Sequence, residues 1–291
     1  MRYRTIGGTT VSEIGLGGMP MSIEGRPDEQ RSVATIHAAL DAGVTLIDTA
    51  DAYHLYAGET GHNERLIAGA IATWGGDASD VLIATKGGHI RPGDGSWIVD
   101  GSPEHLRQAA DASLKALGVE AIGLYQYHRP DPRVPYAESV GALKELRDAG
   151  KIRLVGISNA TVEQIDIARE VLGEGGLASV QNQFSPAFTS SEPELAHCAA
   201  LGIAFLPWSP LGGIGRAARV GARHEAFQRV ADAHEVSPQQ VTLAWMLAKA
   251  PVVIPIPGAS RPESITDSVR AADLVLAGAE LGELDASVGL A

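Results

Sequence analysis

Four side chains with acid–base chemistry stand at or just after the ends of three apolar segments. Asp48 ends the first segment and precedes Tyr53 by five residues, while Lys86 and His128 end the next two. A lysine ammonium lowers the pKa of a nearby phenol, and a carboxylate keeps that lysine charged and in place. An imidazole can donate a hydrogen bond to a carbonyl oxygen on which negative charge develops. These residue types suit protonation of a carbonyl oxygen while hydride, which only a cofactor can supply, reaches the carbon.

Alternating apolar and amphipathic segments predict the elements that position these four residues. Strand-like runs occur at Glu13–Leu16, Thr45–Asp48, Val81–Lys86, Ile122–His128, Leu154–Ser158, Ala178–Gln181, Ala204–Trp208 and Val252–Pro255. Apolar residues spaced i, i+3, i+4 predict helices between them, for example at Arg31–Ala42, Asn63–Ala72, Pro103–Leu117, Tyr136–Ala149 and Val162–Leu172. This alternation predicts a parallel sheet. The even strand count and short connections favour a closed (β/α)8 TIM barrel over a doubly wound sheet, with the active site in the loops after the strands.

The beginning of the chain departs from this alternation. Tyr3–Thr10, with its Gly7-Gly8 pair, predicts a short β-hairpin that closes the floor of the barrel. No linker or low-complexity tract interrupts the rest, so residues 1–291 are expected to form a single barrel domain.

Composition excludes several classes of partner. The net charge of −12 argues against nucleic acid and against an anionic membrane surface. No apolar run is long enough to span a bilayer, and the first residues lack the apolar core of a signal peptide. The single cysteine excludes an internal disulfide and fits a reducing compartment. We therefore expect a cytoplasmic protein that acts on a small molecule; its oligomeric state is not predicted.

The four residues, taken in order, resemble the catalytic tetrad of the aldo-keto reductases. Further segments extend the resemblance over nearly the whole chain: Asp48–Tyr53 with Asn63-Glu64, Gly150–Asn159, Val180–Asn182, Pro207–Gly213 and Ile254–Ser260. The resemblance implies a barrel enzyme that reduces an aldehyde or ketone by hydride transfer from NADPH. It also implies that Tyr53 is the general acid, assisted by Asp48, Lys86 and His128.

The same resemblance implies which residues hold the dinucleotide. Ser158, Asn159 and Gln181 would bind the nicotinamide amide, Trp208 would stack on the ring, and the loops that follow would wrap the phosphates. The implied cofactor-binding residues are Met19, Ser158, Asn159, Gln181, Trp208, Ser209, Leu211, Gly212, Gly213, Gly258, Ser260 and Arg261. NADP(H) is expected in preference to NAD(H). The preference should be weaker than in relatives, because Ser264 and Ser268 replace the family's usual residues and leave Arg261 to supply the charge.

The segment Thr85–Trp97, together with Pro210–Gly213, is similar to bacterial pyridoxal reductases in particular. It implies a long loop after the third strand, with Trp97 as a pocket wall. His89 in this loop is a candidate substrate contact or a solvated residue. A pyridoxal-like substrate and a sugar carbonyl both fit. Arg91 and Asp94 of this loop could contact a polar substrate or could be solvated.

Two other classes of function compete with the reductase. One is a non-catalytic NADPH-binding protein that senses redox state or serves as a regulatory subunit, and turnover of a generic aldehyde would separate it from an enzyme. The other is a metal-dependent barrel hydrolase, which needs clustered His and acid ligands at strand ends. Only His128 is so placed, so no metal site is expected.

Overall fold

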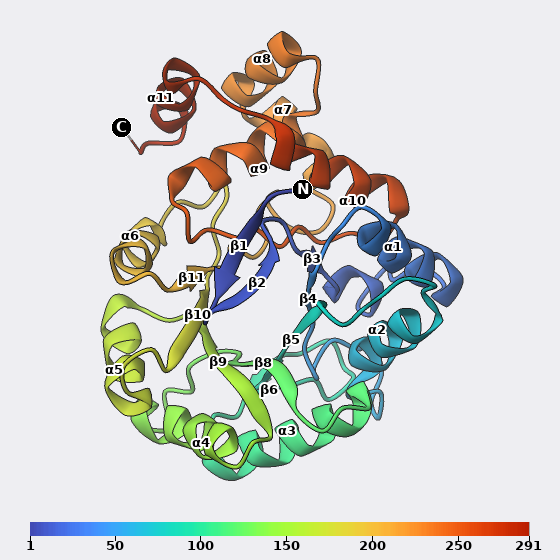
Figure 1. The fold of residues 1–291 in the computed structure, drawn as a ribbon, viewed down its shortest axis with the longest axis vertical. Coiled ribbons are helices and arrows are strands. Elements are labelled where there is room, and N and C mark those ends of the chain that lie inside the picture. The colour runs from blue at the N-terminus through green and yellow to red at the C-terminus, as the bar shows by residue number, and fades with distance from the viewer. Residues whose placement is uncertain (291) are drawn as a thin grey trace.

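The computed structural model describes residues 1–290, and its centre is a curved parallel sheet. The strands follow the order β11-β10-β9-β8-β5-β4-β3. Their bounds are β3 Leu16–Gly17, β4 Leu46–Asp48, β5 Leu82–Gly87, β8 Ile122–Tyr127, β9 Ile152–Ser158, β10 Leu177–Gln181 and β11 Ala204–Phe205. Helices surround this sheet (Figure 1), which gives a TIM-barrel-like α/β fold.

The segment 252–258 joins the two edges of the sheet without forming a regular strand. Its backbone accepts hydrogen bonds from Gly15 and Gly17 beside β3, at 3.0 and 2.9 Å, and Ile254 donates to Phe205 of β11 at 2.8 Å. The predicted strand Val252–Pro255 is therefore wrong as a continuous strand. The physical reason is that the prolines at 251, 255 and 257 have no N–H group to donate to a ladder.

A glycine allows the close approach of chains at this seam. A Cβ atom at Gly17 would lie 2.9 Å from the carbonyl oxygen of Ile256, so a larger residue would push the two edges apart. Two other predicted strands differ from the structure by three residues at one end. The first begins at Leu16 instead of Glu13, because the Glu13 backbone N–H donates to the Arg2 carbonyl at 3.1 Å and so belongs to the N-terminal hairpin. The predicted Ala204–Trp208 ends at Phe205, just before Pro207.

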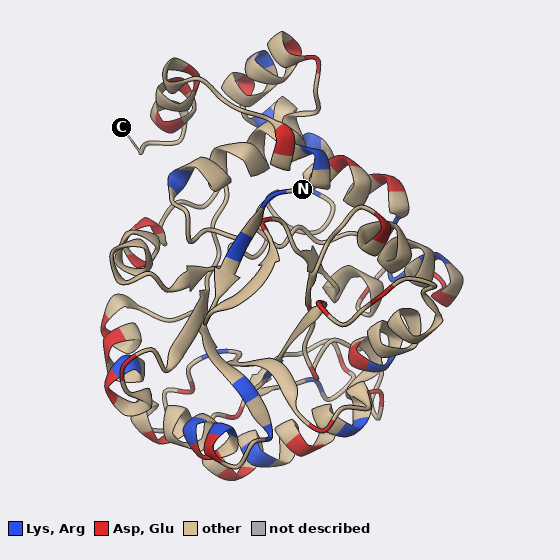
Figure 2. Cartoon of the chain, in the orientation of Figure 1, with Lys and Arg blue, Asp and Glu red and all other residues tan. Residues whose placement is uncertain are grey.

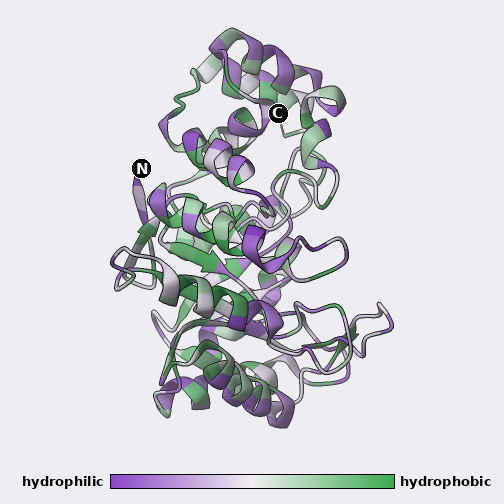
Figure 3. Ribbon diagram, turned by 90° about the vertical axis from the view of Figure 1, so that its right-hand side faces the viewer, coloured by the Kyte–Doolittle hydropathy of each residue, from purple (hydrophilic) through white to green (hydrophobic). Residues whose placement is uncertain are grey.

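The helices match the predicted periodicity closely. Those that cover the sheet are α1 Glu29–Asp41, α2 His62–Thr73, α3 Pro103–Leu117, α4 Tyr136–Asp148, α5 Val162–Leu172, α6 Glu192–Leu201, α9 Pro238–Lys249 and α10 Pro262–Val269. Local signals set their ends: the Ser102 hydroxyl accepts from His105 N at 3.3 Å at the start of α3, and Gly118, at φ 68°, ends it. Charged residues lie mainly on these outer helices (Figure 2), whereas the strands of the central sheet are largely hydrophobic (Figure 3).

A β-hairpin precedes the barrel, as the Gly7-Gly8 pair predicts. Strand β1 (Tyr3–Ile6) pairs antiparallel with β2 (Thr9–Ser12). Ile6 and Val11 belong to one buried cluster with apolar side chains of β4, β5, β8, β10 and the 252–258 segment. In Figure 1 both strands lie over the centre of the ring of strands.

Three further helices lie together beyond α9 (Figure 1), outside the ring that covers the sheet. They are α7 Val220–Arg223, α8 Glu225–His234 and α11 Gly278–Ser287. Trp245 of α9 donates its indole N–H to Asp285 of α11 at 2.7 Å, which ties this group to the barrel. None of the helices within residues 1–290 is long and apolar enough to cross a bilayer.

Candidate active site

The structure brings the four predicted catalytic residues together at the carboxyl ends of β4, β5 and β8. Lys86, which has no exposed surface, donates from Nζ to Asp48 Oδ1 at 2.6 Å, to the Thr49 carbonyl at 2.8 Å and to the Tyr53 hydroxyl at 3.2 Å. These contacts use all three donors of the ammonium group. The lysine is therefore fixed between its carboxylate partner and the tyrosine.

Two glutamines that the sequence interpretation did not associate with Asp48 fix its carboxylate. Gln181 Nε2 donates to Asp48 Oδ2 at 2.7 Å, and Gln126 Nε2 donates to the same oxygen at 3.3 Å. Both glutamines are buried inside strands, where a polar residue is unusual, and that burial pattern is the signal that could have identified them. Gln181 thereby offers only its carbonyl oxygen to a bound amide.

Burial and neighbouring charges determine the protonation states of Lys86 and Tyr53. Burial would lower the pKa of Lys86, but the Asp48 carboxylate and Tyr53 outweigh burial and raise it, so the lysine stays charged. Burial raises the pKa of Tyr53 above its ordinary value, and the Lys86 ammonium only partly opposes this. The Lys86 charge lowers the pKa of Tyr53, as expected, but burial has the larger effect, and Tyr53 is held protonated.

His128 completes the group as a neutral imidazole. Burial lowers the pKa of His128 well below its ordinary value, and the neighbouring His89 lowers it further. The His128 ring lies edge-on to Tyr53 at 5.7 Å between ring centroids and is tilted against His89 at 4.2 Å. Its Nδ1 has no hydrogen-bond partner in the described chain.

A cavity of about 900 Å³ opens over these strand ends. The predicted site residues that line it are Met19, Asp48, Tyr53, His89, Trp97, His128, Ser158, Asn159, Gln181, Trp208, Ser209, Leu211, Gly213, Gly258, Ser260 and Arg261. Lys86 lies behind this wall with no exposed surface, and Gly212 does not line it. The loop predicted after the third strand contains a hairpin of β6 (His89–Ile90) and β7 (Ile98–Val99), in which Arg91 is buried and Asp94 is exposed.

The part of the cavity beyond the tetrad has the donors and backbone shape that a nicotinamide dinucleotide needs. Trp208 Nε1 is a buried donor without a partner among residues 1–290. Asn159 and Ser209 adopt positive φ angles of 58° and 51°, which are uncommon for residues other than glycine. Gly213, at φ 98°, lets the backbone approach a phosphate closely. The residues present therefore fit the cofactor.

At the far end of the cavity lies the N-terminus of a helix, beside an exposed arginine. Gly258, Ser260, Arg261 and Ser264 line it, and α10 begins directly after Arg261. The exposed Arg261 side chain donates from Nε to Ser264 Oγ at 2.7 Å. Ser268 is buried and does not line the cavity. This end combines backbone N–H groups, a hydroxyl and a guanidinium, which are ligands for a phosphate.

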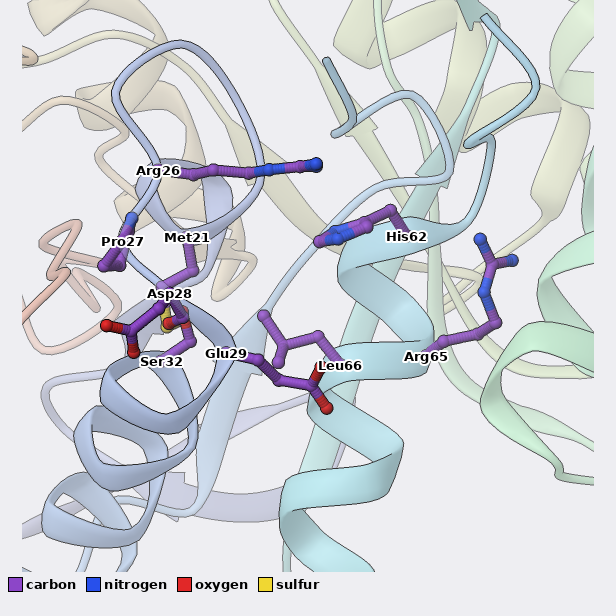
Figure 4. A pocket seen from close by; sticks show the side chains of 9 residues that line it. All are labelled: Met21, Arg26, Pro27, Asp28, Glu29, Ser32, His62, Arg65 and Leu66. Carbon is purple, nitrogen blue, oxygen red and sulfur yellow. The ribbon is translucent and has the colours of Figure 1, made fainter. Parts of the chain in front are cut away.

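A second cavity, of about 410 Å³, lies between the first turns of α1 and α2 (Figure 4). Arg26, His62 and Arg65 line it together with the acids Asp28 and Glu29. Arg26 is already paired with Glu59 at 2.9 and 3.0 Å. None of the predicted site residues reaches this cavity, so the chemistry belongs to the larger one.

Two buried carboxyl groups, those of Asp51 and Glu64, lie behind the site, and they should make the stability of the fold depend on pH. Burial, with the neighbouring Glu64, raises the pKa of Asp51 well above its ordinary value of 3.8, and Asp51 Oδ1 has no partner in the described part of the chain. The folded state therefore binds this proton more tightly than the unfolded state, and stability falls as pH rises above about 4. Asp51→Asn should abolish this loss and raise the free energy of unfolding at neutral pH by about 1–3 kcal/mol.

Thermal unfolding of both proteins from pH 5 to pH 9 checks this. The gap in Tm between variant and wild type should widen with pH. Asp80→Asn, at an exposed position, is the matched control and should leave Tm unchanged. A lower Tm of Asp51→Asn than of wild type, or a difference in Tm that does not grow with pH, would show that the Asp51 carboxylate is ionised in the folded protein without loss of stability.

A parallel α/β barrel whose strand ends hold a Tyr–Lys–Asp–His group beside a deep cavity defines a class of carbonyl-reducing oxidoreductase. The model of the Aldo/keto reductase family matches residues 13–288. The chain is 34% identical over 284 residues to "Uncharacterized oxidoreductase C215.11c" of Schizosaccharomyces pombe, covering 96% of this chain and 88% of that protein. It is also 34% identical over 280 residues to "6-dehydroglucose reductase" of Novosphingobium aromaticivorans, covering 92% and 90%.

A solved structure agrees with these relatives. The aldo/keto reductase from Klebsiella pneumoniae in complex with NADP and acetate superposes with a TM-score of 0.79 at 28% identity, covering 97% of this chain and 93% of that one. The protein therefore belongs to the aldo/keto reductase family. It is an NAD(P)H-dependent carbonyl-reducing enzyme.

Proposed function

We propose that this enzyme reduces an aldehyde or a ketone to an alcohol with NADPH, and that Tyr53 is the general acid. The observation that carries the proposal is the Lys86 ammonium, which contacts the Asp48 carboxylate at 2.6 Å and the Tyr53 hydroxyl at 3.2 Å. A buried tyrosine without this neighbour would leave an unstabilised phenolate after giving up its proton. The contact therefore makes Tyr53 able to donate.

The chain's own residues perform the proton chemistry. The substrate carbonyl oxygen sits against the Tyr53 hydroxyl and the neutral His128 ring, and both donate hydrogen bonds as charge grows on that oxygen. The Tyr53 O–H bond breaks and its proton passes to the oxygen, while Lys86 stabilises the phenolate that remains. Asp48, held by Gln181 and Gln126, keeps the lysine charged and oriented throughout.

The cofactor assignment rests on the donor set of the cavity. NADPH, when bound, supplies the hydride that reduces the carbonyl carbon. Ser158, Asn159 and the Gln181 carbonyl oxygen would hold its amide, Trp208 would face its ring, and the Ser209–Gly213 loop would hold its phosphates. The NADP complex of the Klebsiella pneumoniae relative supports NADP as the cofactor.

Arg261→Ala should raise the Kd for NADPH about tenfold or more and leave the Kd for NADH nearly unchanged. The reason is that a guanidinium forms charge-assisted bonds to a 2′-phosphate, and such bonds contribute roughly 1.5–3 kcal/mol each. NADH has no phosphate at that position. Titration of both cofactors into wild type and variant measures the effect.

The exposed Arg270, which does not line the cavity, provides the control: Arg270→Ala should bind both cofactors as wild type does. Equal affinity of wild type for NADH and NADPH would refute the preference. An equal loss for both cofactors in Arg261→Ala would remove Arg261 from the 2′-phosphate site.

The substrate belongs to one of two kinds of carbonyl compound. A pyridoxal-like aldehyde is supported by the aromatic residues at the substrate end, Tyr53, His89 and Trp97. A sugar carbonyl is supported by the relative named 6-dehydroglucose reductase. NADPH consumption across a panel of aldehydes and ketones that includes pyridoxal and 4-nitrobenzaldehyde tests the proposal. A protein that turns over none of them would contradict it.

The proposal includes the organisation of the chain. Residues 1–291 form a single (β/α)8 domain, with the 252–258 segment as its eighth strand position and the β1–β2 hairpin as the floor of the barrel. The burial of Ile6 and Val11 against interior side chains of several strands supports this role for the hairpin.

A further inference from the structure

Arg91 occupies an unusual position for an arginine in a loop beside a substrate pocket. Its side chain is 1% exposed, although it lies between the short strands β6 and β7 at the rim of the site. Its guanidinium donates to the backbone carbonyl of His54 and pairs with the Glu24 carboxylate. His54 directly follows Tyr53, and Glu24 lines the cavity. One buried charge thus ties together the three segments that frame the substrate end of the cavity.

The guanidinium also lies against the indole of Trp97. Its central carbon is 4.5 Å from the Trp97 ring centroid, the geometry of a cation–π contact. The same indole lies edge-on to Tyr53 at 6.5 Å and is tilted against His89 at 5.3 Å. Trp97 is 40% exposed and lines the cavity. We define these three rings, Tyr53, His89 and Trp97, as the aromatic wall.

The hairpin that carries His89 and Trp97 is too short to fix the position of the Trp97 side chain by itself. Strands β6 and β7 have two residues each, and their pairing leaves the intervening loop without regular structure. An exposed tryptophan on such a hairpin would sample several rotamers. The planar guanidinium restricts it, since its N–H groups are fixed by two partners and its central carbon lies over the indole ring. Arg91 therefore sets where the indole stands relative to the tyrosine hydroxyl.

We propose that Arg91 is a specificity-determining positioning residue, which holds Trp97 so that the aromatic wall accepts the planar aromatic ring of an aldehyde substrate. The inference rests on the proposed function and narrows its substrate class to aromatic aldehydes of the pyridoxal kind. Arg91 acts through Trp97 and does not line the cavity itself. A small open-chain aldehyde contacts Tyr53 but does not extend to Trp97, so its reduction does not depend on Arg91.

The test compares 4-nitrobenzaldehyde and pyridoxal with propanal as substrates of wild type, Arg91→Met, Trp97→Leu and the double variant. Arg91→Met should raise KM for both aromatic aldehydes by about tenfold, the scale of a lost aromatic contact, with kcat and the propanal kinetics near wild type. Trp97→Leu should give the same pattern. The double variant should be no worse than either single variant, since both changes remove the same contact between Trp97 and the aromatic substrate.

Arg133→Met is the matched control, because Arg133 donates to the Val99 carbonyl of the same hairpin without touching Trp97. It should keep the wild-type ratio of aromatic to aliphatic kcat/KM. An unchanged ratio in Arg91→Met, multiplicative losses in the double variant, or an equal change in Arg133→Met would overturn the inference. If Arg91→Met folds poorly, Trp97→Leu still tests the inference. An unchanged ratio of aromatic to aliphatic kcat/KM in Trp97→Leu would show that Trp97 does not bind the aromatic substrate. Failure of wild type to reduce any of the three aldehydes would instead count against the proposed function.

Discussion

Tyr53→Phe is expected to lower kcat by at least about two orders of magnitude, the usual scale for loss of a general acid. The substitution removes only the hydroxyl, which lies 3.2 Å from Lys86 Nζ, and leaves the ring against His128 and Trp97. The Kd for NADPH should therefore stay near the wild-type value. Steady-state rates with 4-nitrobenzaldehyde and a cofactor titration measure the two quantities.

The neighbouring Tyr56 offers a matched control. It is 59% exposed and lies three residues further along the same loop, so Tyr56→Phe should keep wild-type kcat. If Tyr53→Phe retains more than about a tenth of the wild-type rate, Tyr53 is not the proton donor. A parallel loss of NADPH binding would point to a collapsed site.

Lys86→Met should lose activity at neutral pH as heavily as the tyrosine variant. Without the ammonium, nothing offsets the burial that raises the pKa of Tyr53, and the phenolate left after proton transfer has no counter-charge. The two residues act as a unit, so Tyr53→Phe combined with Lys86→Met should be scarcely worse than either single change. Rates of all three variants with one aldehyde decide this.

Stability needs a separate check in this experiment, because Lys86→Met leaves the buried Asp48 carboxylate without its cation, and such a loss costs about 3–5 kcal/mol. Tm and NADPH affinity establish that the variant is folded. Lys144→Met, which removes a surface pair with Asp148, is the control and should be fully active. Independent, multiplicative losses in the double variant would show that Lys86 does not act through Tyr53.

The residues at the strand ends could be predicted because local signals fix them. Asp48 and Lys86 each end an apolar run that is typical of a buried strand, and parallel strands bring their carboxyl ends to one face. The five helices whose bounds were predicted agree to within two residues at either end, because caps such as Ser102 and Gly118 are sequence signals. The glutamines that hold Asp48 come from strands 78 and 133 residues away, and no local pattern links them to it.

The remaining differences have equally local causes. Residues 252–258 are apolar enough to suggest a strand. They form no regular strand because the prolines at 251, 255 and 257 have no N–H group to donate to a neighbouring strand. The direction of the Tyr53 pKa depends on how completely the ring is buried, and this is a property of the packed cavity. Arg91 appears in the sequence as one more charge in a glycine-rich loop. Its burial becomes visible only when Glu24 and the His54 carbonyl are placed around it.

The most direct test of the central claim follows a hydrogen atom from cofactor to product. NADPH that carries deuterium at both positions of C4 of the nicotinamide is incubated with 4-nitrobenzaldehyde and the enzyme, and the alcohol is analysed by mass spectrometry. The account predicts one deuterium on the carbinol carbon and one NADPH oxidised per alcohol formed, with Tyr53→Phe forming at most about a hundredth as much per unit time. Tight NADPH binding without any labelled alcohol, across the aldehyde panel, would contradict the account and identify a cofactor-binding protein that performs no reduction.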